Sequence, residues 1–454
     1  MKLKQMMVSG MKSMLQRTGM NRYFIVVPYI VGMGLFLLLT GCEQSQPPEF
    51  RLNMVQMVSL ETAPAYQQEI ADVLGALFGT PDEPFAMPET GLDQSQLKLA
   101  AGPAWSGEEG SVYGLYRKHC VHCHGVTGDG RGPTARFLNP YPRDYRAGTY
   151  KFKSTYNATK PTDKDLYAVL YHGVPGTAMP SFALLPSSEI ETLVEYVKYL
   201  SMRGQMETEL INYVAEELGE EDGERIPFDP VSDQEQRGVI QEILAEIASD
   251  WGASAENVIQ AEEAQLPQEN RTAEEIAASV ELGRALFYGN KANCLKCHGP
   301  TALGDGQRDD QDIWNKSNKK FQDDTALLLE RVNENQGTSD LDAAGRERLA
   351  TDVKVLAVRE TVAARLYPVR NAIPRNLRKG IYRGGRRPLD IYRRVHAGIP
   401  GTPMPGSGPA SLGAKGTLTD VEIWNVVDYV LSLPYEGPSQ PQRALPVNAQ
   451  NIAN

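Results

Sequence analysis

The sequence is poor in cysteine, histidine and long hydrophobic runs. Its 454 residues include only five cysteines and six histidines, and the one extended apolar run lies at residues 23–40. Together with a mean hydropathy of −0.38, this excludes a membrane protein with several spans. The hydrophobic share of 41% is nevertheless too high for a wholly disordered chain. At one domain per roughly 100–200 residues, the length predicts two to four domains.

Positive charge is also scarce. The chain has 46 Lys and Arg against 57 Asp and Glu, which gives a net charge of −11. Five of the bases lie in residues 1–41, which contain no acid, so the remaining chain is more acidic still. Proteins whose main partner is nucleic acid normally present a basic surface. The composition therefore argues against a nucleic-acid partner.

The apolar run follows the basic N-terminal stretch and ends just before a cysteine. Residues 39–42 read Leu-Thr-Gly-Cys, which resembles the lipobox of bacterial lipoproteins, where the cysteine is lipidated and becomes the mature N-terminus. We therefore expect a signal peptide at residues 1–41, lipidation at Cys42, and a chain anchored by lipid to the periplasmic side of the cell membrane. An uncleaved signal anchor is the alternative, and it too leaves the remaining chain outside the cytoplasm.

The other four cysteines form two copies of a CxxCH motif. Such a run indicates covalent haem attachment, in which two thioethers hold the haem and the adjacent histidine binds its iron. A redox-active CxxC pair would not need the histidine, and a structural zinc site suits an exported chain poorly. We therefore predict two haem c groups. Their thioether and iron ligands are Cys120, Cys123 and His124 in the first copy, and Cys294, Cys297 and His298 in the second.

A longer repeat surrounds these motifs. Residues 165–180 read DLYAVLYHGVPGTAMP and residues 390–405 read DIYRRVHAGIPGTPMP, with eight identical positions. Upstream, residues 142–150 match residues 374–382. Each CxxCH motif therefore begins its own copy of one module.

Met179 and Met404 occupy the same position in the repeated G-T-x-M-P loop. Methionine is more often a core filler than a ligand, but a loop stiffened by glycine and proline can hold a thioether over the iron. We predict both as axial ligands, and His/Met ligation raises the haem potential. Met87 precedes both CxxCH motifs and lacks the Gly-Thr pair, so it is not included. His172 and His396 are not repeated and are not expected to bind iron.

These motifs resemble class I c-type cytochromes, specifically tandem dihaem bacterial electron carriers. The resemblance covers roughly residues 106–202 and 273–435. It implies small all-helical modules in which two crossing helices and the loops between them enclose the haem. It also implies that a proline carbonyl after CxxCH accepts the N–H of the axial histidine. Pro133 lies at that place in the first module, and the second module has no proline there.

Helical signals support an all-α fold independently of the resemblance. Thr272 and Glu275 form a capping-box pattern before the second CxxCH motif, and Ser187 and Thr419 precede apolar residues at helical spacing. Strand-like alternation is rare between these segments. The fold class that we expect is two tandem cytochrome c domains with few strands or none.

The spacing of the repeat and the local charge indicate how the chain is divided. The distance in sequence between matching residues of the two modules is 174 at the CxxCH motifs and 232 at the next matching segment. This increase predicts an insertion in the second module at about residues 307–370, parts of it helical. Residues 207–263 are strongly acidic but carry one amphipathic helix, so the linker is partly ordered. The expected parts are a spacer at 42–105, cytochrome c domain 1 at 106–202, the acidic linker at 203–271, cytochrome c domain 2 at 272–436 and a disordered tail at 437–454.

Basic residues near the second ligand loop are candidates for binding the haem carboxylates. Arginine can bind a carboxylate through two parallel hydrogen bonds. The candidates that occur in both modules are Arg146 and Tyr150 in the first, and Arg378 and Tyr382 in the second.

The combined expectation is an electron carrier rather than an enzyme. Two His/Met haems would pass single electrons in a respiratory chain, from a dehydrogenase or quinol-oxidising complex to a terminal oxidase or small cytochrome. A dihaem peroxidase is the alternative, but it needs an iron with an open or displaceable sixth position, and two matching methionine loops argue against that. A haem-bearing subunit of a larger respiratory complex is a third interpretation.

Overall fold

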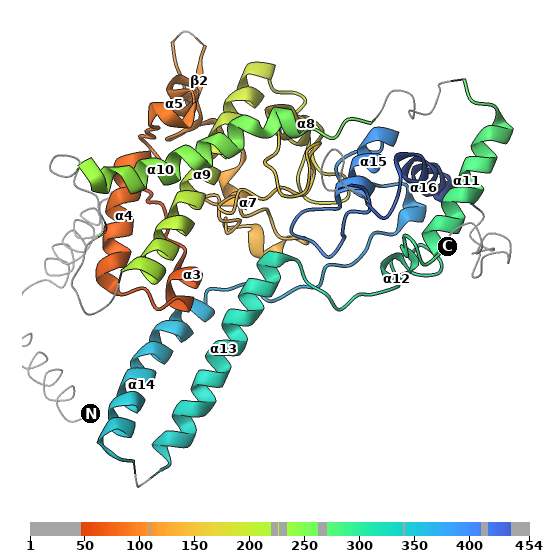
Figure 1. Cartoon of the computed structure of the whole chain (residues 1–454). Helices are drawn as coiled ribbons and strands as arrows, with labels where there is room; N and C mark the ends of the chain where they lie inside the picture. The colour runs from red at the N-terminus through yellow and green to blue at the C-terminus, as the bar shows by residue number, and fades with distance from the viewer. Residues whose placement is uncertain are drawn as a thin grey trace, which may run out of the picture. The chain divides into compact units, whose positions relative to one another are not determined.

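The computed structural model describes residues 47–108, 110–218, 226, 234–261, 270–338, 341–409 and 416–436. The predicted signal peptide, the lipidation site at Cys42 and the predicted tail at 437–454 lie outside the described residues. From residue 49 onward, the described residues belong to one compact unit. Its described part is mainly helical (Figure 1), which confirms the expected helical character.

Helices account for most of the regular structure, and a short antiparallel hairpin pairs strands β1 (Trp105–Ser106) and β2 (Val112–Tyr113). The α-helices are α3 (Met54–Ser59), α4 (Pro64–Phe78), α5 (Gln94–Ala100), α6 (Leu115–His119), α7 (Val121–His124), α8 (Asp163–His172), α9 (Ser187–Glu217), α10 (Gln234–Gly252), α11 (Ala273–Tyr288), α12 (Leu295–His298), α13 (Ile313–Gln336), α14 (Ala343–Ala363), α15 (Pro388–Ala397) and α16 (Asp420–Ser432).

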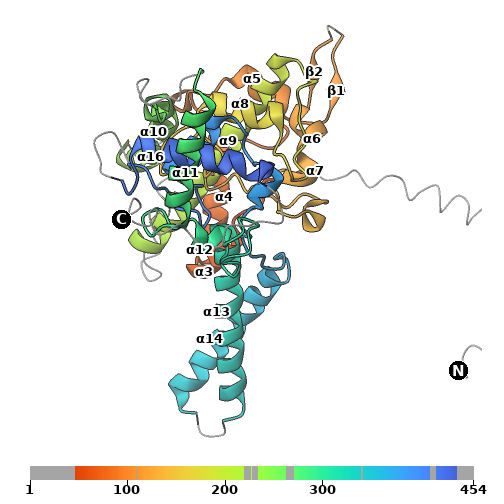
Figure 2. The same ribbon diagram turned by 90° about the vertical axis from the view of Figure 1, so that its right-hand side faces the viewer.

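Helix α9 organises the N-terminal half of the unit, residues 49–261. Helices α4, α5, α6, α8 and α10 all contact it, as Figure 2 shows for α4 and α8. Its buried residues recur at helical spacing along its length, from Leu193 and Val197 to Leu210 and Val214. Because several faces of α9 are covered, the helix is apolar over more than the single stripe of an ordinary surface helix.

The structure corrects the expectation that residues 42–105 are a spacer. Leu74, Phe78 and Leu97 are fully buried in the same core as α9, and the hydroxyl of Tyr199 donates a hydrogen bond to the carbonyl of Phe78. Helix α9 continues without a break to Glu217, past residue 202, where we expected cytochrome c domain 1 to end. Sequence periodicity can reveal an apolar helix face but not which distant helix covers it.

A cavity mutation in α4 tests this packing. Replacing Leu74 by alanine is expected to lower the free energy of unfolding by about 2–5 kcal/mol, because the leucine is completely buried and its neighbours close the space only in part. Leu60 is 43% exposed, so Leu60→Ala is the matched control and should cost no more than about 0.5 kcal/mol. Urea unfolding measures both. If both variants lowered the free energy of unfolding by the same small amount, α4 would not be part of the core and would act as a spacer.

The acidic linker is helical where the sequence predicted it. Ile240, Leu244 and Ile247 of α10 are buried against the core that contains α9, which confirms the amphipathic helix. The indole N–H of Trp251 donates to Oε1 of Gln205 at 2.9 Å. This part of the linker therefore belongs to the N-terminal half rather than joining two separate domains.

Helices α11 and α16 form the centre of the C-terminal half, residues 270–436. Both begin with capping boxes, at Thr272 and Thr419, as predicted. They cross so closely at Gly283 that a Cβ atom there would lie 1.9 Å from the carbonyl oxygen of Asn425. Only glycine permits this approach, so the crossing depends on that residue.

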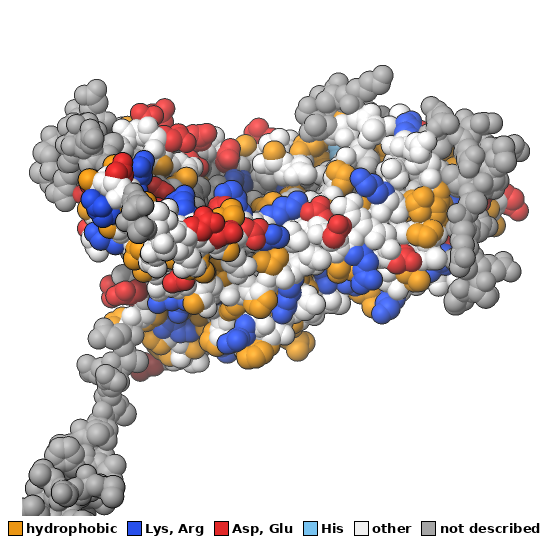
Figure 3. All heavy atoms as spheres, turned by 90° about the horizontal axis from the view of Figure 1, so that it is seen from below, with side chains coloured by type: hydrophobic (Ala, Val, Ile, Leu, Met, Phe, Trp, Pro, Cys, Tyr) orange, Lys and Arg blue, Asp and Glu red, His pale blue; other side chains and the backbone are white. Residues whose placement is uncertain are grey.

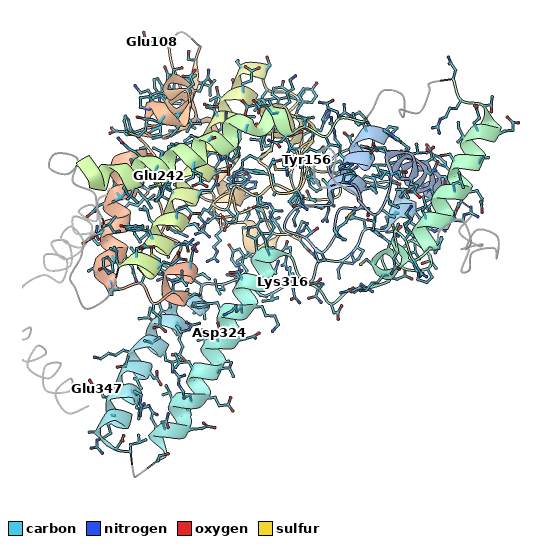
Figure 4. All side chains as sticks on the ribbon, viewed as in Figure 1. Glu108, Tyr156, Glu242, Lys316, Asp324 and Glu347 are labelled. Atoms are coloured by element: carbon cyan, nitrogen blue, oxygen red, sulfur yellow. The ribbon has the colours of Figure 1, made fainter. Side chains whose placement is uncertain are left out.

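Helices α13 and α14 lie within the expected insertion and pack against each other (Figures 1 and 2). Phe321 of α13 and Val362 of α14 share a small core with Val58 of α3. Charged side chains also lie along the two helices, including Lys316 and Asp324 on α13 and Glu347 on α14, which Figure 4 labels.

Surface charge is mixed in sign on the face shown in Figure 3, where Lys and Arg side chains are interspersed with acidic and apolar ones. Within the described residues, no helix combines the length and the apolar character that a membrane span requires.

Candidate haem sites

The second CxxCH motif lines a large cavity. Cys294, Cys297 and His298 lie on or beside α12, and they share the cavity with Met404, which follows α15. The cavity volume is about 1490 Å³, which exceeds the roughly 300–1,000 Å³ of ordinary ligand pockets. Apolar side chains from several helices and loops line it, including Phe287, Leu377, Ile391, Val395, Val426 and Val430.

Arginines supply the polar part of the same wall. Arg375, Arg383 and Arg394 line the cavity, and burial lowers the pKa of Arg383 and Arg394 to about 10. The Nε atoms of Arg375 and Arg383 are buried without a hydrogen-bond partner in the described residues. Buried cations with free donors favour an anionic ligand. Thiols, an imidazole, a thioether, apolar walls and unpaired arginines fit a haem with its two carboxylates.

The first CxxCH motif has a histidine whose ring orientation is fixed by the backbone. Nδ1 of His124 lies 3.1 Å from the carbonyl oxygen of Arg143. A proton on Nδ1 donates to that carbonyl and leaves Nε2 free for a metal. Burial lowers the pKa of His124 to about 4, so the ring is neutral, which is the form that binds metals. The ring also stacks on Tyr145 at 4.7 Å between centroids.

This hydrogen bond corrects the expectation for Pro133. The proline is exposed, and the acceptor is the carbonyl of Arg143, ten residues farther along the chain. Its repeat-matched counterpart is Arg375. Burial lowers the pKa of His298, and the nearby Arg375 carbonyl offsets part of that lowering. The contact falls outside hydrogen-bonding geometry, so Nδ1 of His298 has no partner among the described residues.

The two methionine loops have the same hydrogen bonds. In the first loop, the amide of Thr177 donates to the carbonyl of Val174 at 3.1 Å, and the amide of Met179 donates to Oγ1 of Thr177 at 3.1 Å. The second loop repeats both bonds at 3.1 and 3.2 Å, with Thr402, Ile399 and Met404 in the corresponding positions.

A proline and a glycine close each of these loops as a type II turn. The glycines, Gly176 and Gly401, have φ of +71° and +72°, values that glycine adopts without strain. Each methionine backbone is therefore held by the turn and by the threonine side chain together.

The segments that follow the two CxxCH motifs also have matching backbone hydrogen bonds. Gly130 donates to the carbonyl of His124 at 2.9 Å, and Gly304 donates to that of His298 at 3.0 Å. The amide of Tyr145 bonds to the carbonyl of Gly128 at 2.7 Å, and the corresponding pair, Leu377 and Ala302, does so at 3.0 Å. The repeat seen in the sequence therefore extends to local backbone structure.

The cysteines do not resemble a redox pair or a zinc site. None of the four is in a disulfide, and burial raises the pKa of the Cys120 and Cys294 thiols to about 12. Redox-active cysteines have a lowered pKa, and zinc binds the thiolate form. In the part of the chain that the structure describes, no group of three or more His, Cys, Asp or Glu side chains is placed to hold a metal ion.

The two halves differ in how they surround the predicted ligands. Cys120, Cys123, His124 and Met179 are not among the residues that line the large cavity. Cys120 is buried in the core around α9, and Met179 packs against that core. The structure thus brings the four predicted ligands of the second site around one space, and it packs those of the first site among protein side chains.

The predicted carboxylate-binding residues already have protein partners. Arg146 binds Asp144 through two hydrogen bonds of 3.0 and 2.7 Å. Arg378 donates to the Thr301 carbonyl and to Glu436. The Tyr150 hydroxyl lies 2.6 Å from Oγ of Ser201, and that of Tyr382 donates to the Val430 carbonyl at 2.8 Å. Nη1 of Arg378 is also buried without a partner, but Arg378 does not line the cavity, whereas Arg375 and Arg383 do. The sequence placed both of these arginines in the basic stretch near the second ligand loop without selecting them, although Arg375 lies in the repeated segment.

The unrepeated histidines lie away from the cavity lining. His172 is exposed. His396 is buried beside Tyr156 and Tyr392, with ring centroids 5.8 and 5.7 Å away, and Tyr156 is labelled in Figure 4. Neither histidine lines the cavity next to Met404.

These features define a mainly helical protein with a site for covalently attached haem. Residues 112–201 match the family model for cytochrome c, so this part of the chain is a cytochrome c domain, which implies covalently bound haem c. A comparison with curated proteins finds no match. Among solved structures, a chain of the Kuenenia stuttgartiensis reducing HAO-like protein complex Kustc0457/Kustc0458 is similar, with 22% identity and a TM-score of 0.41. The likeness covers 72% of this chain and 97% of that one, and it is too distant to support an argument.

Proposed function

We propose that this protein is a dihaem c-type cytochrome that transfers single electrons. In this proposal residues 272–436 form a second cytochrome c domain, interrupted by the α13–α14 insertion. Each domain holds one haem through its cysteine pair, its adjacent histidine and its loop methionine. When bound, haem c supplies an iron that is oxidised and reduced by one electron.

The observation that carries the proposal is the repeated methionine loop. Met179 and Met404 each follow a type II turn and have matching backbone hydrogen bonds, and Met404 shares a cavity with Cys294, Cys297 and His298. A fixed thioether suits electron transfer, because a rigid ligand set changes little between oxidation states. Substrate turnover at iron would instead require an open position, and the unrepeated histidines do not line the cavity.

The location and partners that we propose follow from the sequence. Export, lipidation at Cys42 and attachment to the periplasmic face of the membrane would place the haems where respiratory complexes exchange electrons. The donor would be a dehydrogenase or a quinol-oxidising complex, and the acceptor a terminal oxidase or a small cytochrome. The predicted insertion and linker are expected to include contact surfaces if the protein is instead a subunit of a larger complex.

A redox titration of the purified full chain tests the proposal. We expect two haems per chain, two one-electron steps and low-spin spectra in both oxidation states, because both irons have two protein ligands. Hydrogen peroxide added to the reduced protein should be consumed slowly. Rapid peroxide turnover, or a high-spin signal from one haem, would favour a peroxidase. Stable co-purification with oxidase or quinol-oxidising subunits would favour a subunit of a complex.

A further inference from the structure

Trp314 lies in the first turn of α13, the first helix of the α13–α14 insertion (Figure 1). The turn begins at Asp312, whose side chain accepts a hydrogen bond from the amide of Asn315 at 3.1 Å. Asp312 also forms an ion pair with Lys151 at 2.9 Å. Because Lys151 belongs to the cytochrome c domain, these contacts hold the first turn of α13 against the N-terminal half.

On one side, Trp314 stacks on the residue that orients the first axial histidine. The guanidinium carbon of Arg143 lies 3.5 Å from the centre of the indole ring, a close cation–π contact. The carbonyl of the same arginine is the hydrogen-bond acceptor of His124. Arg143 therefore contacts both the indole and the histidine of the first site.

On the other side, Trp314 packs on the methionine loop of the second site. The amide of Ile313 donates to the carbonyl of Gly401 at 3.0 Å, and a Cβ atom on Gly401 would lie 2.7 Å from the indole. Gly401 is part of the turn that precedes Met404. The indole thus occupies the space that a side chain at position 401 would need.

The indole also belongs to the wall of the second site. Trp314 lines the cavity together with His298 and Met404, and its N–H is buried without an acceptor among the described residues. An unpaired buried donor is unfavourable, so the indole N–H favours a ligand that supplies an acceptor. A haem carboxylate has the required chemistry.

We propose that Trp314 is a positioning residue that couples the two haem sites, with its indole ring bridging Arg143 of the first site and the Met404 loop of the second. This inference rests on the proposed function, since it requires both haems. The insertion then has a specific role, because the first turn of α13 contains the aromatic ring that contacts both sites. Electron exchange between the haems would pass through the contacts that this ring makes.

The test compares Trp314→Met with Trp314→Phe in the full chain. Methionine fills much of the volume without an aromatic ring, whereas phenylalanine keeps a ring but loses the N–H. Trp105 is 55% exposed and stacks on Tyr113 in the β1–β2 hairpin, so Trp105→Met is the matched control. The measurements are haem content, the midpoint potentials, and the rate of electron transfer between the haems after photoreduction of one of them.

We expect Trp314→Met to slow electron transfer between the haems by roughly tenfold, equivalent to ~1.4 kcal/mol in activation free energy. Trp314→Phe should keep most of the rate and lower the potential of the second haem, because the carboxylate loses a donor. The Trp105 variant should match the wild type. An unchanged rate in Trp314→Met, or equal slowing in both Trp314 variants, would overturn the bridging role.

A second variant covers the case in which Trp314→Met binds fewer haems. Arg143→Gln keeps the backbone carbonyl that accepts from His124 but removes the guanidinium from the indole face, so it should also slow the exchange. An unaffected rate in that variant would overturn the inference. The proposed function fails separately, since a wild-type chain with fewer than two haems would contradict it before any Trp314 variant is measured.

Discussion

Replacing Met404 by alanine is expected to lower the midpoint potential of one haem and to remove about half of the Met–iron charge-transfer absorption of the ferric protein. The thioether favours the reduced iron, and alanine offers no ligand in its place. Met179→Ala should have the same effect on the other haem. Spectroelectrochemical titration and the near-infrared spectrum of the oxidised protein measure both quantities.

Met87 provides the control for these variants. It also precedes a proline and is partly buried, but it lies in the N-terminal segment before both CxxCH motifs. Met87→Ala should leave the potentials and the absorption band unchanged. If Met179→Ala and Met404→Ala both retained the full band, the assignment of these residues as axial ligands would be wrong.

Removing one cysteine pair should remove one covalently bound haem. The Cys294→Ala/Cys297→Ala double variant is expected to carry half the haem of the wild type after denaturation, because no thioether then attaches the second group. The Cys120→Ala/Cys123→Ala double variant should lose the first haem instead. Mass spectrometry of the denatured chain and haem absorbance per chain measure the loss.

Cys42 is the remaining cysteine and supplies a control of the same residue type. Cys42→Ala should retain both haems but lose the lipid mass and the association with membranes. A wild-type chain that carried a single haem, and lost it in only one of the double variants, would show that the other CxxCH motif has a different use.

The parts of the structure that the sequence predicted well depend on short stretches of chain. The capping boxes at Thr272 and Thr419, the amphipathic helix α10 and the two methionine loops are all determined by residues within about one helix length of one another. The repeat added information, since it aligned Met179 with Met404 and drew attention to the segment that contains Arg143 and Arg375.

The expectations that failed depend on contacts between distant parts of the chain. Helices α4 and α5, within residues 49–105, pack against α9, which begins only at residue 187, and nothing in their own spacing identifies that partner. The His124 acceptor was assigned to Pro133 from the resemblance, but the loop after CxxCH brings the Arg143 carbonyl to the imidazole instead. Trp314 has no counterpart in the other module, so repetition could not reveal it.

The unbroken course of α9 affects how fragments of this protein should be prepared. The stretch recognised as cytochrome c ends at residue 201, yet α9 runs on to Glu217 and buries Met206 and Leu210 beyond that point. A gene fragment cut at 112 and 201 would sever this helix and strip away α4, α5 and α10, leaving apolar surface exposed to solvent. The segment that matches the family model is therefore smaller than the unit that folds together. A fragment should keep the described residues from 49 to 436, because Ile259 packs in the core of the C-terminal half and Val58 packs with Phe321 and Val362.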